Sequence, residues 1–241
     1  MKFPLMVTLG AVYVAVLLGV NQDVYIYMDE MFHVPQAQRY CNGNFNSYDP
    51  KITTPPGLYI LSLLMYWVSR LGGSSIINFE CSTTFLRCTN GVISLVMLPV
   101  LLLLRSEMYP PPTARSMSTS WTRIKGKLNS NNNQELEVQQ LHMLHSLVIF
   151  MYPVSAFFYA LYYTDSASLL MFLSSYYLSL LETRRDQNAV TSPSLFLSIL
   201  SKTSLFLSSS LAILSRQTNA VWLMFIFGKQ PIHPAGLRYC Y

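Results

Sequence analysis

The sequence has few charged residues. Only 11% of its 241 residues are Asp, Glu, Lys or Arg, whereas 51% are hydrophobic, and soluble domains carry charge on roughly a quarter of their residues. This shortage excludes an ordinary soluble domain and indicates a membrane protein. The net charge of +5 does not predict nucleic-acid binding, because the basic residues are spread thinly and no RNP, zinc-finger or helix-turn-helix pattern accompanies them.

Patterned cysteines are also lacking. The four cysteines form no C-x-x-C pair, so they predict no metal site and leave the redox compartment open. No internal repeat recurs at a fixed period, which excludes a solenoid. The paired broken helices of a small transporter are not visible either.

Long apolar runs, by contrast, are abundant. About 18 to 20 mainly apolar residues cover the hydrocarbon core as a helix, and such a helix satisfies its own backbone hydrogen bonds. We therefore expect an all-α, polytopic bundle of transmembrane helices. The candidate spans are residues 3–20, 85–104, 146–163, 166–181 and 194–214. We expect the first to be a retained anchor, because no A-x-A-like cleavage site follows it.

Two polar stretches, residues 21–56 and 105–140, interrupt the apolar pattern. The second is rich in Pro, Ser and Asn and in basic residues, which predicts a cytoplasmic loop by the positive-inside rule. The first is acidic and belongs on the opposite side. Residues 57–71 number only 15, too few for a comfortable span, and they predict an interfacial or re-entrant helix that starts at the preceding Pro-Pro-Gly.

Asp29 and Glu30 stand side by side in the first polar stretch, in the sequence YMDEMFH. Carboxylates beside hydrocarbon tend to mark a substrate path, and desolvation raises a carboxyl pKa toward the range of a general base. Capping of a helix and plain solvation are the alternatives. Since adjacent residues do not share a helix face, we expect one base and one positioning group, ahead of a short helix over residues 35–41.

Two further residues are candidates on the same side of the membrane. His33 has the chemistry of a metal ligand, a general base, a phosphate contact or a hydrogen-bonded structural residue. Asp165 follows the run that contains Pro153, where we expect a kink. In the expected topology Asp165 emerges on the side of Asp29 and Glu30, and capping of the next helix is its alternative role.

Arg216, Gln217 and Asn219 interrupt an apolar region that otherwise runs from residue 205 to 227. Polar groups at such a position need a partner, and an arginine offers a lipid phosphate a fixed fork of donors. Snorkelling of the arginine to the interface is the alternative.

Three stretches together resemble a known family. They are YMDEMFHVPQAQRYCNGNFNSYDPKITTPPGLY, FYALYYTD and SRQTNAVW. In sequence and order they are similar to the eukaryotic endoplasmic-reticulum alpha-1,2-glucosyltransferases, GT-C enzymes that use dolichyl-phosphate glucose to add the terminal glucose to the lipid-linked oligosaccharide precursor of N-glycosylation.

The resemblance implies a multi-pass protein of the endoplasmic-reticulum membrane whose lumenal loop 21–56 carries an acidic catalytic base. Of Asp29 and Glu30 we prefer Asp29 for that role. Our candidates for substrate contacts are His33, Asp165, Arg216, Gln217 and Asn219, and the phosphate contact is open to Arg216, His33 or a basic residue outside this chain. The partners that the resemblance implies are dolichyl-phosphate glucose and the lipid-linked oligosaccharide. We expect an inverting transfer without cofactor or metal, because the donor carries one phosphate to neutralise.

The chain departs from this family in length. Family members carry further spans after the region that ends near Gly228, whereas residues 229–241 form an unrelated polar tail. We therefore expect residues 1–228 to be a truncated, N-terminal portion of the family's transmembrane module. A catalytically inactive membrane subunit that acts through protein interaction is the alternative function.

Overall fold

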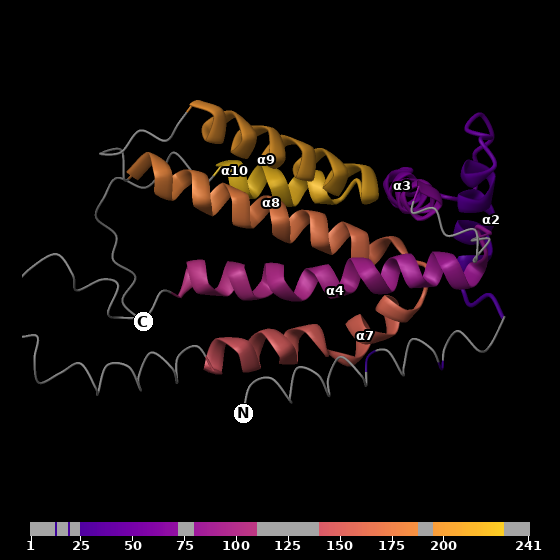
Figure 1. Ribbon diagram of the computed structural model, residues 1–241, viewed down its shortest axis with the longest axis horizontal. Helices are drawn as coiled ribbons and strands as arrows, with labels where there is room; N and C mark the ends of the chain where they lie inside the picture. Colours follow the sequence, from indigo (N-terminus) through magenta and orange to yellow (C-terminus); the bar gives the residue numbers. More distant parts are fainter. Residues whose placement is uncertain are drawn as a thin grey trace, which may run out of the picture.

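The computed structural model of the chain describes Tyr13, Gly19 and residues 25–71, 80–109, 140–187 and 195–228. All regular structure in these ranges is helical, as expected. The longer helices run side by side along the long axis of the molecule (Figure 1). They are α4 (Thr83–Met108), α8 (Thr164–Gln187), α9 (Leu195–Ser215) and the shorter α10 (Asn219–Gly228).

Two of these helices are long and apolar enough to cross a bilayer: α4 and the Phe196–Ser215 part of α9. They confirm the predicted spans 85–104 and 194–214. The 26 residues of α4 give a length of about 39 Å. The 24 residues of α8 extend the predicted span 166–181 at both ends. Because of its serines, its tyrosines and its charged ends, α8 is less apolar than α4 and α9. Apart from Tyr13 and Gly19, the run 3–20 lies outside the described residues.

The predicted span 146–163 is a bent pair of helices. A helix over Gln140–Phe150 meets α7 (Pro153–Ala160) at 62°. Pro153 takes the first position of α7, where its missing N–H costs no hydrogen bond, so the expected kink is a complete break. The Phe150 and Tyr159 rings stack across it with centroids 5.0 Å apart. Residues 110–139 of the expected polar loop and the tail 229–241 lie outside the described residues.

Helices α2 (Glu30–Cys41) and α3 (Gly57–Leu71) cover one end of the bundle, and α3 lies across it (Figure 1). The bounds of α3 match the predicted 57–71. The start predicted for α2 at residue 35 was wrong: the Asp29 carbonyl already accepts from the N–H groups of Phe32 and His33, so Pro35 lies inside the helix.

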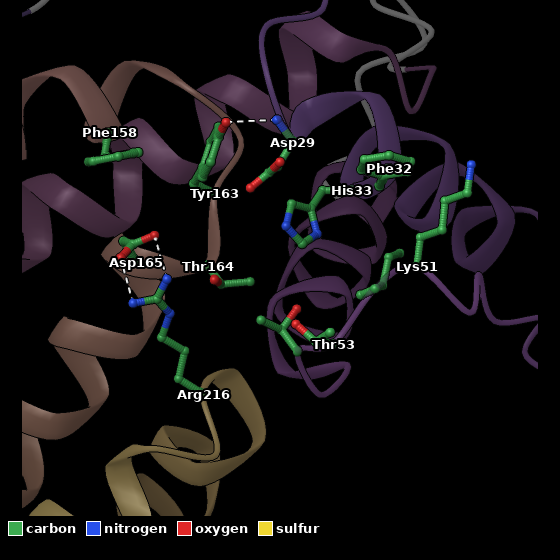
Figure 2. Close-up of a pocket in the computed structure, with 12 residues that line it drawn as sticks. Asp29, Phe32, His33, Lys51, Thr53, Phe158, Tyr163, Thr164, Asp165 and Arg216 are labelled. Carbon is green, nitrogen blue, oxygen red and sulfur yellow. Dashed lines mark hydrogen bonds and ion pairs between the residues drawn. The ribbon is translucent and has the colours of Figure 1, made fainter.

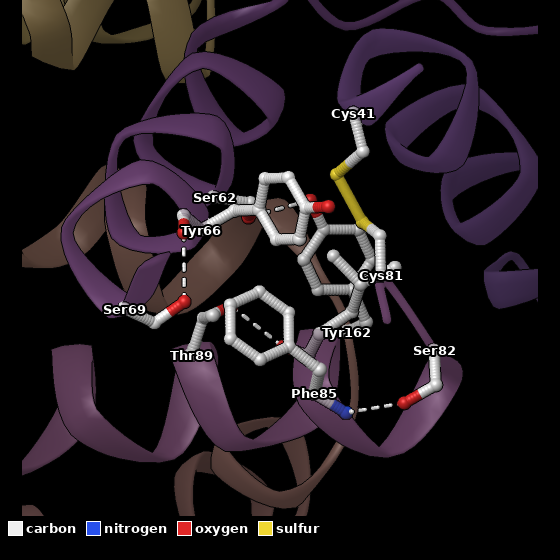
Figure 3. Close-up of a disulfide and its surroundings, with 10 residues drawn as sticks. Cys41, Ser62, Tyr66, Ser69, Cys81, Ser82, Phe85, Thr89 and Tyr162 are labelled. Carbon is white, nitrogen blue, oxygen red and sulfur yellow. Dashed lines mark hydrogen bonds between the residues drawn. A yellow bond between two sulfur atoms is a disulfide. The ribbon is translucent and has the colours of Figure 1, made fainter. Parts of the chain in front are cut away.

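A disulfide between Cys41 and Cys81 ties the end of α2 to the segment before α4 (Figure 3). It closes a loop of 40 residues that contains α3. A loop of this size stabilises a fold by about 4 kcal/mol in the chain-entropy account. Cysteine spacing alone did not reveal this pair.

The serine-rich face of α8 explains its place between α4 and α9. Ser175 and Ser179 are buried, and the Ser175 hydroxyl donates to Ser208 Oγ on α9 at 3.1 Å. Small polar residues let spanning helices approach closely and bond to one another. The interface therefore relies on close packing rather than on large apolar side chains.

Gly57 sets the distance between α3 and α9. A Cβ at this position would lie 2.5 Å from the carbonyl oxygen of Leu214 and 2.7 Å from the amide of Ser215, both backbone atoms. Only a residue without a side chain allows this approach. The first turn of α3 is thereby fixed against the end of α9.

We expect Gly57→Ala to lower the free energy of unfolding by about 1–3 kcal/mol, because the two backbones must separate. Thermal unfolding in detergent, followed by size-exclusion chromatography, measures the effect. Gly228→Ala is the matched control, since a Cβ there meets nothing within 4 Å. Equal melting temperatures for both variants would contradict the close contact.

Candidate active site

A polar cavity of about 350 Å³ lies where α2 and α8 begin and α9 ends, beside the loop before α3 (Figure 2). It brings together four of the predicted site residues: Asp29, His33, Asp165 and Arg216. The remaining lining side chains are Phe32, Lys51, Ile52, Thr53, Thr54, Phe158, Tyr163 and Thr164. Residues more than 180 positions apart in sequence thus meet at one end of the bundle.

Asp29 is the N-cap residue of α2, yet its side chain makes no capping hydrogen bond. Its backbone N–H donates to the Tyr163 hydroxyl at 2.8 Å. Met28, directly before it, has a φ of 49°, a left-handed conformation that costs a side-chain-bearing residue roughly 1 kcal/mol or more. The backbone is therefore held in an unusual turn, and the carboxylate lines the cavity instead of capping the helix.

Glu30 lies outside the cavity and has no exposed surface. Its two carboxylate oxygens accept from Arg87 Nε at 3.0 Å and Arg87 Nη2 at 2.7 Å. The backbone N–H groups of Tyr162 and Tyr27 also donate to it, at 2.7 and 3.0 Å. Through these partners, Glu30 connects α2, α4 and the turn before α8 on the side away from the cavity.

The hydrogen bonds decide the charge of Glu30. Burial alone would raise the pKa of this carboxyl, but donation by Arg87 and by the Tyr162 and Tyr27 amides outweighs burial and places the pKa below its ordinary value of 4.5. Glu30 is consequently ionised at neutral pH. Its ion pair with Arg87 is a buried and bidentate one, the strong geometry for such a pair.

Hydrogen bonds from α4 hold the turn between α7 and α8. One helical turn beyond Arg87, the Asn90 amide donates to the carbonyls of Leu161 and Tyr163 at 2.7 and 2.8 Å. The Tyr162 hydroxyl meets Ser62 on α3 at 2.8 Å (Figure 3). This turn positions Tyr163 and Asp165 at the cavity.

Asp165 and Arg216 form an ion pair in the wall of the cavity. Nη1 of Arg216 lies 2.9 Å from Oδ1 of Asp165, and Nη2 lies 3.3 Å from Oδ2. Both side chains are partly exposed, so the pair is reachable by a ligand. The sequence suggested a lipid phosphate as the partner of Arg216, whereas the structure pairs Arg216 with Asp165 of the same chain, which orients the guanidinium.

His33 is buried beside this pair, and its Nδ1 lies 2.6 Å from the Tyr59 hydroxyl. Burial lowers the pKa of His33, against the opposing effects of Asp29 and Asp165. The ring is therefore neutral at physiological pH.

The last two predicted residues lie apart from the polar cavity. Gln217 is exposed at the break between α9 and α10. Asn219 is buried and donates to Ser168 Oγ and to the Ala212 carbonyl, both at 2.8 Å. Asn219 therefore closes the break and ties it to α8.

A second, larger cavity adjoins the first. It has a volume of about 620 Å³ and shares Phe158, Asp165 and Arg216 with the polar cavity. Most of its exposed wall is apolar, from side chains such as Leu169, Phe172 and Trp222, and Ser168, Thr218 and the predicted residue Asn219 line it as well. A polar and an apolar compartment thus meet at the Asp165–Arg216 pair.

Reasoning from the sequence missed several residues that build the site. Arg87 had a signal: it is a single cation at the start of an apolar run, and such a charge needs a partner. Lys51 was not predicted, although it lines the cavity and its Nζ lies 5.6 Å from the centroid of the Phe32 ring. Tyr59 and Tyr163 lie in the stretches that resemble the family, but nothing in their local sequence indicates their roles, because only the tertiary fold gives them their contacts.

We expect removal of the Glu30 carboxylate in Glu30→Ala to cost about 3–5 kcal/mol, because Arg87 is left buried without its main counter-ion. Asp29→Asn should change stability by less than about 1 kcal/mol, since no cap is lost. Melting temperatures in detergent compare the two. The Glu30 contribution is complete above pH 4.5 and is lost as the pH falls through the lowered pKa. Equal losses of stability in the two variants would contradict the assignment of a structural role to Glu30 and not to Asp29.

Comparison with known proteins agrees with the geometry. The sequence model of the DIE2/ALG10 family matches residues 24–235. The chain is 38% identical over 207 residues to an Arabidopsis thaliana protein named Dol-P-Glc:Glc(2)Man(9)GlcNAc(2)-PP-Dol alpha-1,2-glucosyltransferase, covering 83% of this chain and 32% of that protein. A human protein of the same name is 32% identical over 208 residues, covering 84% and 35%.

A Gibberella zeae protein of that name is 35% identical over 209 residues, which is 86% of this chain and 25% of the relative. The chain thus spans about a third or less of the length of these curated relatives. No solved structure matches it. The matched range includes both cavities and the Glu30–Arg87 pair behind them, and the chain belongs to the DIE2/ALG10 family.

Proposed function

We propose that the polar cavity is where glucose passes from dolichyl-phosphate glucose to the lipid-linked oligosaccharide that its relatives' name describes. One arrangement carries this proposal. Asp29, whose carboxylate makes no capping hydrogen bond, and the cation Arg216 line one polar cavity, and this cavity continues into an apolar one. A lipid-linked sugar phosphate has the matching three parts, which are a sugar, an anion and a hydrocarbon chain.

In this proposal the apolar cavity receives the first isoprene units of the donor, and the phosphate lies at the junction beside Arg216. The guanidinium retains donors beyond the two that meet Asp165, so it can bind a phosphate oxygen while the ion pair holds it in place. One phosphate carries little charge, and Arg216 with Lys51 can balance it. We therefore propose transfer without a divalent metal, a point tested by full activity in EDTA.

Asp29 acts as the general base. Its carboxylate takes the proton from the acceptor hydroxyl as that oxygen bonds to the anomeric carbon, while the bond from that carbon to the phosphate oxygen breaks and dolichyl phosphate leaves. A single displacement from the face opposite the phosphate inverts the anomeric centre, so a beta-linked donor yields an alpha linkage. Phe32 and Phe158 offer rings against which sugars can pack.

Membrane residence in the endoplasmic reticulum fits the same features. The cavity and the Cys41–Cys81 disulfide share one end of the bundle, and disulfides persist in oxidising compartments such as that lumen. At the other end, Arg184 on α8 pairs with Glu107 on α4, and Arg105 and Arg185 lie nearby in sequence. Basic residues mark the cytoplasmic side, so we assign the cavity to the lumen.

Asp29→Asn should reduce glucosyl transfer by about 10²–10⁴-fold, the usual contribution of a general base, while the amount of folded protein stays constant. The assay follows labelled glucose from dolichyl-phosphate glucose onto a diglucosylated lipid-linked acceptor in membranes that carry the 241-residue chain. Glu80→Gln is the control, because Glu80 is an exposed carboxylate outside the cavity. Undiminished transfer by Asp29→Asn would assign the base elsewhere. A wild-type chain that transfers nothing and co-purifies with another protein would support the non-catalytic alternative.

Labelling with a polymer-linked maleimide tests the compartment. In a Cys240→Ser background, denatured protein from endoplasmic-reticulum membranes should add one label at Cys88 before reduction and three after it, because Cys41 and Cys81 are bonded and Cys88 is free. Three labels without reduction would show that the loop 21–56 faces a reducing compartment, and the lumenal assignment would be wrong.

A further inference from the structure

His33 presents one ring nitrogen to a buried partner and the other to the cavity. Its Nδ1 lies 2.6 Å from the hydroxyl of Tyr59, which has no exposed surface. Its ring lies between Asp29 and Thr53 in the cavity wall (Figure 2). Nε2 is therefore the nitrogen that can meet a ligand.

The protonation of this ring is set by its surroundings. Asp29, Glu30 and Asp165 favour the charged imidazolium and Arg216 opposes it, but burial has the largest effect and lowers the pKa of His33. A neutral imidazole has one N–H donor and one lone-pair acceptor. Which nitrogen carries the hydrogen depends on what each of them faces.

Tyr59 is held rigidly enough to impose that choice. The Tyr40 and Tyr48 rings flank it at centroid distances of 5.6 and 6.2 Å, and Gly57, two residues earlier, seats its helix against α9. Burial raises the pKa of the Tyr59 phenol, so the hydroxyl keeps its proton. Tyr48 and Thr54 also lie near this hydroxyl, and its contact of 2.6 Å with Nδ1 of His33 gives the proton a nitrogen acceptor.

The cavity favours the same tautomer from the other side. Asp29 lines it beside His33, and an ionised carboxylate only accepts hydrogen bonds. An N–H that faces such an acceptor is favourable, whereas a nitrogen lone pair in that place would be repelled. A phosphate oxygen entering the cavity makes the same demand.

We propose that Tyr59 donates to Nδ1 of His33 and thereby fixes the tautomer with hydrogen on Nε2, which donates to the phosphate of the bound sugar phosphate. His33 is then a neutral donor that complements the charge of Arg216, and Tyr59 is its positioning residue. The tautomer does not depend on the proposed function; the identity of the acceptor phosphate rests on it.

Nitrogen NMR of the 241-residue chain, labelled with ¹⁵N-histidine in lipid nanodiscs, tests the tautomer directly. The chain has four histidines, and the signal lost in His33→Gln identifies His33. We expect Nε2 of His33 to be protonated and Nδ1 to be bare, and we expect Tyr59→Phe to give a mixture while the other histidines keep their signals. Protonated Nδ1 in the wild type overturns the proposal, and this result needs no folded variant. A folded Tyr59→Phe with an unchanged tautomer also overturns it.

A pair of isosteres tests the donor role. The Gln amide nitrogen reaches the place of Nε2 and keeps a donor there, whereas the shorter Asn amide reaches only the place of Nδ1. We expect His33→Gln to retain transfer within about tenfold and His33→Asn to lose about 10²-fold, the effect of removing one donor to a developing oxyanion. Tyr59→Phe should alter the pH dependence of kcat/KM. Equal losses of transfer in His33→Gln and His33→Asn would overturn the donor role. If the wild-type chain transfers no glucose, the proposed function fails, and the NMR result still decides the tautomer.

Discussion

The buried ion pair between Glu30 and Arg87 is the contact on which the site depends. It joins the start of α2 to α4, and Glu30 also binds the Tyr162 amide in the turn before α8. The Arg87 guanidinium donates in addition to the Tyr25 carbonyl at 2.8 Å. A buried pair of charges often adds little net stability compared with apolar side chains. Here the pair acts by positioning. It fixes the segments that carry Asp29, His33 and Asp165 relative to the Arg87 guanidinium.

The neighbouring carboxylates Asp29 and Glu30 have opposite environments because a helix starts between them. As the first helical residue, Glu30 points back toward α4, while Asp29 remains in the preceding turn, where Met28 has its left-handed φ of 49°. Among the described ion pairs none includes Asp29, whereas Glu30 is fully engaged. The turn at residue 28 is thus as important to the chemistry as the carboxylates are.

The sequence predicted the parts of the fold that depend on composition and local breaks. The all-helical class, the apolar helices α4 and α9, the bounds of α3 and the interruption at Pro153 follow from run lengths and from proline and glycine. It also identified four of the residues that line the polar cavity, through their unusual place beside hydrocarbon. It did not predict Arg87, Tyr59 or the Cys41–Cys81 pair, because each depends on a contact over 26 or more positions. The start of α2 was missed because one lost hydrogen bond at Pro35 costs less than the helix gains.

Helix dipoles account for where the charges of the cavity lie. Asp29 stands at the N-terminus of α2 and Asp165 in the first turn of α8, whereas Arg216 follows the last residue of α9. Negative charge at N-termini and positive charge at a C-terminus are each favoured by roughly 0.3–1 kcal/mol at exposed positions. The ion pair of Asp165 with Arg216 therefore joins two oppositely polarised helix ends. Within the described residues, Asp29 is met only by the dipole of α2 and by the tyrosine at its backbone, so its oxygens stay available to a hydroxyl that enters the cavity.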